Sequence, residues 1–230
     1  MKTSLLPGEL AAYTSRQLNY FFPDDHPVQL GDYQSVVDTA LDRVEHCFKH
    51  IAVKHYCLNG EARFSHTFSD QYAAYLWFLA NTLWQEQAPV PLLHKLFYLN
   101  KTLHAFECMY DTQLPDIFFL SHTVGTVLGK ATYTDFFVVS QGCTVGVHHD
   151  HYPVFDKGVA LAANVSIIGQ CRLGRCVSIG SNTSIFQRDL ADDTTAYTGA
   201  QGVLAIVPSN EPYAQKFFNV DLKAVLRAGI

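Results

Sequence analysis

A six-residue spacing of apolar side chains runs through the second half of the chain and constrains the fold more than any other feature. One series of five residues keeps this spacing, and a companion stands two positions before each member: Leu161, Ile167, Leu173, Ile179 and Ile185, with Val159, Val165, Cys171, Val177 and Thr183. Phe155 precedes the first series. Residues two apart in an extended strand face the same way, so both series point inward and each hexad is a short strand plus a corner. Repeats of this period stack coil upon coil, which predicts a prism-shaped β-helix.

A second run of the same kind occupies residues 121–146. Its expected core series is Val127, Tyr133, Val139 and Val145, with Ala131, Phe137 and Cys143 as companions. From Val145 to Phe155 the step is ten residues, which is one hexad and about four extra residues. Insertions in a solenoid form loops on one face, so residues 147–152 are expected to bulge outward. This loop carries three histidines, His148, His149 and His151.

Before Pro115 the periodicity is that of helices. Apolar residues three and four apart predict helices over residues 9–20, 33–51, 69–86 and 91–109. The chain is therefore predicted to be an α+β protein, with an α-helical N-terminal domain over 1–114 and a β-helix over 115–210. The tail over 211–230 is expected to form a short helix that caps an open coil end.

Composition and charge exclude several classes. The net charge of −5 comes with no basic stripe, which argues against a nucleic-acid partner. No stretch is long and apolar enough to span a bilayer, and the start M-K-T-S-L-L-P-G lacks the apolar run of a signal peptide. The six cysteines are read as reduced thiols, so a cytoplasmic location is expected.

The segment with the most specific chemistry is S-H-T-V-G-T-V-L-G, residues 121–129. His122, Gly125 and Gly129 have the spacing of the D-H-A-T-G-I-V-V-G segment of the serine acetyltransferases. The stretch S-Q-G-C-T-V-G, residues 140–146, resembles the one that precedes the active-site loop of that family. The second half of the chain thus resembles these hexapeptide-repeat acyltransferases, while the first 110 residues show no comparable match.

This resemblance implies a left-handed parallel β-helix, assembled as a homotrimer or as a dimer of trimers. It also implies active sites between neighbouring subunits and acetyl-CoA as the acetyl donor, with no metal. His122 would be the general base that takes a proton from the acceptor hydroxyl as it attacks the thioester. A histidine suits this task because its pKa lies at about 7.

Two positions depart from the pattern of the family. Ser121 stands where the family has an aspartate beside the base, and a serine offers a hydrogen bond but no charge. The second histidine of the family precedes a proline, whereas here Tyr152 precedes Pro153 and His151 lies one residue earlier. We expect His151 to take part in catalysis, with Ser121, His149 and Tyr152 near the acceptor.

For coenzyme A, the resemblance implies a groove along the corners of successive coils, where small residues let the pantetheine arm approach the backbone. The expected groove residues are Gly146, Ala163, Gly169 and Ser181, with Arg175 interrupting the column. Arg188, near the open end, is expected to contact a phosphate of the nucleotide.

Three classes of function follow. The first is an acetyl-CoA-dependent O-acetyltransferase acting on a sugar of a surface polysaccharide or its precursor, or on a small metabolite. The missing aspartate favours a neutral acceptor, and serine O-acetylation in cysteine biosynthesis is the alternative at the same site. The second class is a metal-dependent enzyme on the same scaffold, suggested by the histidine-rich loop. The third is a non-catalytic trimeric scaffold whose helical half recruits a partner.

Overall fold

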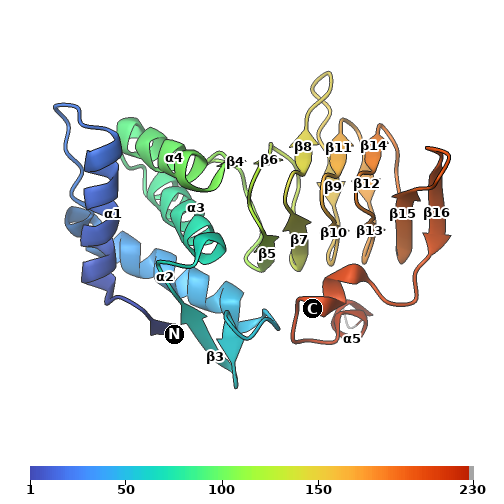
Figure 1. Cartoon of the computed structure of the whole chain (residues 1–230), viewed down its shortest axis with the longest axis horizontal. Coiled ribbons are helices and arrows are strands. Elements are labelled where there is room, and N and C mark those ends of the chain that lie inside the picture. The colour runs from blue at the N-terminus through green and yellow to red at the C-terminus, as the bar shows by residue number, and fades with distance from the viewer. Residues whose placement is uncertain (228–230) are drawn as a thin grey trace.

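The computed structural model describes residues 1–227 and contains a group of helices followed by a prism of short strands (Figure 1). The four long helices come first: α1 (Pro7–Phe21), α2 (Gln34–Lys49), α3 (Ser69–Gln85) and α4 (Val90–His104). Beside them, three strands form a small sheet in the order β1-β3-β2: β1 (Lys2–Thr3), β2 (Cys57–Leu58) and β3 (Glu61–Phe64). Within the described residues, no helix is long and apolar enough to cross a membrane.

All four expected helices are present, and the first three keep their predicted ends to within two residues. The fourth ends five residues early, at His104. Ala105 has a left-handed backbone with a φ of 48°, which stops the helix. The next residues form β4 (Phe106–Cys108), which pairs with β6 (Thr126–Leu128) in a sheet of the prism. The first strand of the prism therefore precedes Pro115.

Each of the three sides of the prism is a stack of parallel strands. The first side holds β5 (Phe118–Ser121), β7 (Phe137–Ser140), β10 (Ala160–Leu161), β13 (Ser178–Ile179) and β15 (Thr194–Thr198), with β16 (Leu204–Pro208) antiparallel at its end. The second side holds β4, β6, β8 (Thr144–Gly146), β11 (Ser166–Ile168) and β14 (Ser184–Phe186). The third side holds β9 (Val154–Phe155) and β12 (Arg172–Leu173). The second part of the chain is thus a parallel β-helix, as the six-residue period predicts, and it has the left-handed course that the family resemblance implies.

The side chains of the six-residue series fill the inside of the prism. From Phe155 to Ile185, both predicted series are at most 2% exposed. Leu161 pairs with Ile179, and Ile167 pairs with Ile185, in each case 18 residues later. One turn of the prism therefore takes three hexads. Burying an aliphatic side chain of this size contributes about 1.5–3 kcal/mol.

The earlier run departs from its predicted register at one position. Leu128 pairs with Val145 and is buried, whereas Val127 is only partly buried, so the choice of Val127 as a core residue was wrong. A slip of one residue moves a side chain to the other face of a strand. The six-residue spacing fails here because Leu128 lies five, not six, residues before Tyr133. Tyr133 itself is buried, as expected.

The extra residues before β9 form a hairpin that projects from the prism beside β8 (Figure 1). The backbone N–H groups of His148 and His151 each donate to the carbonyl of the other, with N···O distances of 3.2 and 3.0 Å. At the tip, His149 and Asp150 have φ angles of 47° and 60°. Two positive φ angles in succession are typical of a type I′ two-residue turn.

The described part of the tail runs back toward the helices, which differs from the expected position over an open coil end (Figure 1). It contains η2 (Tyr213–Lys216) and α5 (Leu222–Arg227). Tyr213 donates its backbone N–H to Ser178 Oγ at 2.9 Å, and Ala52 donates to the Phe217 carbonyl at 2.8 Å. Phe217 also stacks on Phe119, with the ring centroids 5.0 Å apart. These hydrogen bonds and the stacked ring pair hold the tail against the prism.

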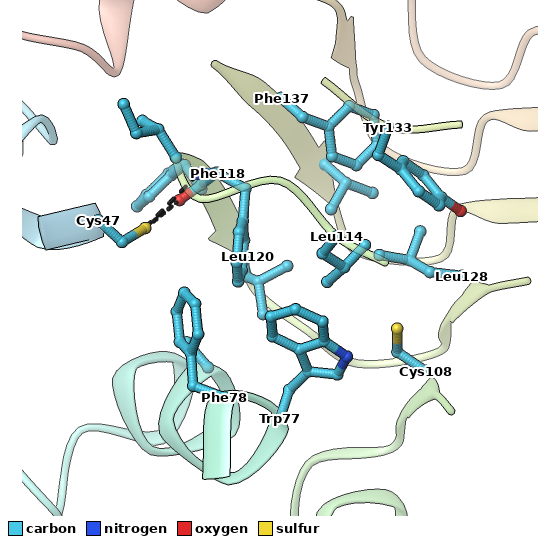
Figure 2. Close-up of a cluster of buried hydrophobic side chains, with 14 of the residues drawn as sticks. Cys47, Trp77, Phe78, Cys108, Leu114, Phe118, Leu120, Leu128, Tyr133 and Phe137 are labelled. Carbon is cyan, nitrogen blue, oxygen red and sulfur yellow. Dashed lines mark hydrogen bonds between the residues drawn. The ribbon is translucent and has the colours of Figure 1, made fainter. Parts of the chain in front are cut away.

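A cluster of buried side chains joins the helices to the first coil of the prism (Figure 2). Trp77 and Phe78 of α3 pack against Phe118 of β5, with ring centroids 5.5 and 5.2 Å apart. The thiol of Cys47, on α2, donates to the Phe118 carbonyl with an S···O distance of 3.2 Å. The helices are therefore packed directly onto the coil that also carries His122.

The buried thiols lead to a first prediction. All six cysteines are free and buried, and burial raises the pKa of Cys47 to about 12 and that of Cys176 to about 11. Because the thiolate is the reactive form, the native protein should react slowly with Ellman's reagent at about pH 8. In guanidinium chloride, all six thiols should react. A thiol that reacts rapidly in the native protein would contradict this packing.

Candidate functional site

The corners of the prism line up in edges, and backbone hydrogen bonds between coils show which corners share an edge. Along the first edge, the N–H of Asn164 donates to the Gln141 carbonyl, and that of Asn182 donates to the Ala163 carbonyl. Along the second edge, Gly169 donates in the same way to Gly146. Corresponding corners of successive coils therefore stack on one edge.

The predicted site residues divide between two edges. Ser121, His122, Ala163 and Ser181 lie at or just after the ends of strands of the first side, on the first edge. Gly146, His149, His151, Tyr152 and Arg188 lie at or after the ends of strands of the second side, on the second edge. Within residues 1–227, no hydrogen bond, ion pair or ring contact joins His122 to the loop.

The expected coenzyme A groove needs a correction for the same reason. A column of residues six apart was expected to form one groove, but its successive members lie on different edges. Gly169 is on the second edge, and Arg175 is on the third, where its carbonyl accepts the N–H of Asp193. Ala163 and Ser181 do share an edge, and it is the edge of His122.

His122 lies at the corner directly after β5, with its side chain 76% exposed. Its φ of 56° is left-handed, which is uncommon for a residue with a side chain and turns the ring outward at this corner. The backbone N–H donates to Asp70 Oδ2 at 3.1 Å. Nδ1 of the ring lies 4.0 Å from the same oxygen, which is too long for a hydrogen bond but close enough for a charge interaction.

Asp70 is a candidate site residue that no sequence motif indicates. It lies in the first turn of α3, and its side chain is 14% exposed. A separation of 52 residues from His122 leaves no local pattern to connect the two. An aspartate at the start of a helix is first interpreted as a partner of the helix dipole. In space, however, Asp70 supplies a carboxylate beside His122, the feature that Ser121 lacks.

A second histidine, His104, is buried close to this site. It is the last residue of α4 and is 7% exposed. Burial lowers its pKa to about 4, and the charge of Asp70 opposes this shift. His104 is therefore neutral at pH 7, and its Nδ1 lies 2.8 Å from Asn100 Oδ1. Its backbone carbonyl accepts the Thr123 hydroxyl at 3.2 Å, which ties α4 to the corner that carries His122.

The histidine hairpin lies on the second edge. The ring of His148 packs edge-on against Phe186, with centroids 4.9 Å apart, and its Nδ1 lies 3.1 Å from Gln187 Nε2. His149, His151 and Tyr152 are exposed. In the part of the chain that the structure describes, no three His, Cys, Asp or Glu side chains are grouped so that they could hold a metal ion.

The residues expected to bind coenzyme A differ in their surroundings. Ser181 lines a cavity of about 480 Å³ between the first side of the prism and the tail, where Tyr213 and Lys216 form the opposite wall. Gly146 is closely packed, because a Cβ there would lie 3.0 Å from Ile168 Cδ1. Arg188 is exposed on the second edge.

The fold is shared with solved serine acetyltransferases. No protein-family model and no curated protein sequence matches the chain. The structure of the enzyme from Vibrio cholerae O1 biovar El Tor N16961 aligns with a TM-score of 0.67 and 18% identity, over 89% of this chain and 81% of that chain. A serine acetyltransferase in complex with CoA aligns with a TM-score of 0.63 and 17% identity, over 87% and 86%. Soybean serine acetyltransferase complexed with serine aligns with a TM-score of 0.58 and 19% identity, over 77% of this chain and 72% of that chain. The likeness covers the helices as well as the β-helix.

The buried His104 leads to a prediction about acid stability. Its folded pKa of about 4 is below the ordinary value of 6.5, so the unfolded chain binds more protons between these pH values. The free energy of unfolding should therefore fall by roughly 1–3 kcal/mol as the pH drops from 6.5 towards 4. Urea unfolding of the wild type and of His104→Asn at about pH 7 and pH 4.5 measures this loss.

The His104→Asn variant should lack this part of the acid sensitivity, whereas His94→Asn, an exposed histidine on the same helix, should behave like the wild type. Equal acid sensitivity in all three proteins would rule out His104 as the cause.

Proposed function

We propose that this protein is an acetyl-CoA-dependent O-acetyltransferase in which His122 is the general base and L-serine is the first acceptor to test. The observation that carries the proposal is an exposed imidazole at a prism corner, with a carboxylate 4.0 Å from its Nδ1. The shared fold with serine acetyltransferases, one of them in complex with CoA, supports the choice of donor.

The chemistry follows from the properties of the imidazole. A hydroxyl is a weak nucleophile at neutral pH, so Nε2 of His122 accepts its proton as the oxygen attacks the thioester carbonyl carbon. The tetrahedral intermediate then collapses and the C–S bond breaks. The departing thiolate takes the proton back from His122, which leaves an acetyl ester, free coenzyme A and the neutral imidazole. Asp70 stabilises the imidazolium while it holds the proton.

Asp70 also changes the preferred acceptor. The sequence favoured a neutral acceptor because Ser121 brings no charge to the base. A carboxylate beside an exposed histidine offers an ion-pair partner for the ammonium group of L-serine. The soybean serine acetyltransferase that shares the fold is complexed with serine, which supports the same choice. A sugar hydroxyl remains the alternative acceptor.

The division of the site residues between two edges supports a homotrimer. In a threefold arrangement, the first edge of one copy faces the second edge of the next, so that His149, His151 and Tyr152 of one copy approach His122 of another. Exposed apolar side chains lie at both edges, with Val124 66% exposed on the first edge and Val147 and Phe186 49% and 51% exposed on the second. Such contacts would cover them.

Replacing His122 tests the proposed base. His122→Ala should lower kcat for transfer from acetyl-CoA by about 100-fold to 10,000-fold, the usual contribution of a general base. Release of free coenzyme A, followed with a thiol reagent, measures the rate with L-serine and with a panel of sugars and nucleotide sugars. His94→Ala, which removes an exposed histidine from α4, should keep the wild-type rate.

Activity with a sugar and not with serine would contradict L-serine as the acceptor and favour a sugar hydroxyl. If the folded protein releases no thiol with any acceptor, the proposed transferase activity is wrong, and the non-catalytic scaffold is the remaining class.

Replacing Asp70 tests the carboxylate. Asp70→Asn keeps an oxygen that can accept the His122 N–H but removes the charge. We expect kcat/KM for L-serine to fall about 10-fold to 100-fold, the loss that accompanies one hydrogen bond to a charged group. If Asp70 binds the ammonium, most of this loss should appear in KM. Asp42→Asn, at an exposed position on α2, is the matched control, and an equal loss in both variants would refute the role of Asp70.

A further inference from the structure

A second cavity lies in the helical part of the chain, away from the edges of the prism. Its volume is about 250 Å³, and its walls come from β1, β3 and the start of α3. Lys2, His55 and Arg63 line it, together with Ser4 and Ser65. None of the lining residues is acidic, although acidic residues outnumber basic ones by 21 to 16 in the chain.

The pairing of β1 with β3 brings two positive charges together at this cavity. Lys2 and Arg63 are direct partners in the parallel register, so their side chains leave the sheet on the same face. Like charges placed opposite each other on neighbouring strands are unfavourable. Within residues 1–227, neither side chain takes part in an ion pair with a carboxylate. Within the described residues, no carboxylate is therefore paired with either cation.

Arg63 also has an unmet hydrogen-bonding group. Its Nε is buried and has no hydrogen-bond partner. A buried donor without a partner is costly, and native proteins rarely leave one. The two terminal nitrogens of the guanidinium are not buried in this way and make no hydrogen bond within residues 1–227, so they can donate to an acceptor that enters the cavity.

The wall of the cavity is held rigidly by Gln71, which is 1% exposed. Its Oε1 accepts the Ser65 N–H at 2.7 Å, and its Nε2 donates to the His55 carbonyl at 2.9 Å. A preformed wall lowers the entropic cost of binding. The volume lies below the roughly 300–1,000 Å³ of pockets for drug-sized ligands, which favours a smaller ligand.

We propose that this cavity binds a small oxyanion with a phosphate or carboxylate group. The ammonium of Lys2 attracts the anion as a point charge, and the guanidinium of Arg63 donates hydrogen bonds from its planar fork. The bound anion places a negative charge beside the two cations and accepts hydrogen bonds from the guanidinium. This site is distinct from the His122 site and does not depend on the proposed transferase activity.

Isothermal titration calorimetry of the full chain tests the proposal, with inorganic phosphate and malonate as probes. Chloride keeps the ionic strength constant, so that general screening does not imitate binding. We expect saturable binding by the wild type, at least about tenfold weaker in Lys2→Gln and in Arg63→Gln. Arg16→Gln, which removes an exposed cation from α1, should keep the wild-type affinity. The probe that binds more tightly identifies the preferred group.

Two results would overturn the proposal: no saturable binding of either probe by the wild type, or equal affinity in the Lys2→Gln and Arg16→Gln variants. Lys2 is exposed on a strand at the edge of the small sheet, so its replacement is compatible with folding. It therefore gives a clear answer even if Arg63→Gln fails to fold.

Discussion

The rest of this structure depends on the stacking of inward-facing side chains between coils of the prism. Strands of two to five residues bond only to the coils before and after them, so the stacked core keeps each coil in place. Leu161 above Ile179 and Ile167 above Ile185 set the register. Once that register is fixed, every corner falls at a defined place, and a corner is where this fold exposes a side chain without disturbing its core.

Much of the fold could be predicted because the spacing of apolar residues is regular. The segments where this spacing is interrupted could not be predicted. The hexads from Phe155 onward and the helices over residues 34–49 and 69–85 follow one pattern throughout, because a single burial requirement repeats. Leu128 was missed where one step shortens to five residues. The course of the tail depends on aromatic contacts with distant segments, such as Phe217 with Phe119, which no local pattern encodes.

The candidate site was predictable only in the parts that a contiguous motif carries. His122 stands in a glycine frame with a specific spacing, and the structure places its ring in the open. Asp70 is brought to it by the packing of Trp77 and Phe78 on Phe118, which positions α3 against the first coil. The expected coenzyme A groove placed residues of three different edges in one column. This happened because the six-residue spacing does not show how many sides the prism has.

Two consecutive residues of α3 serve different surfaces. Asp70 accepts the backbone N–H of His122, and Gln71 holds Ser65 and His55 in the wall of the cationic cavity. Successive residues of a helix are rotated by about 100°, so one short turn can present neighbouring side chains in two directions. A rotation or shift of this turn would therefore displace a wall of the cavity and the carboxylate beside His122 at the same time.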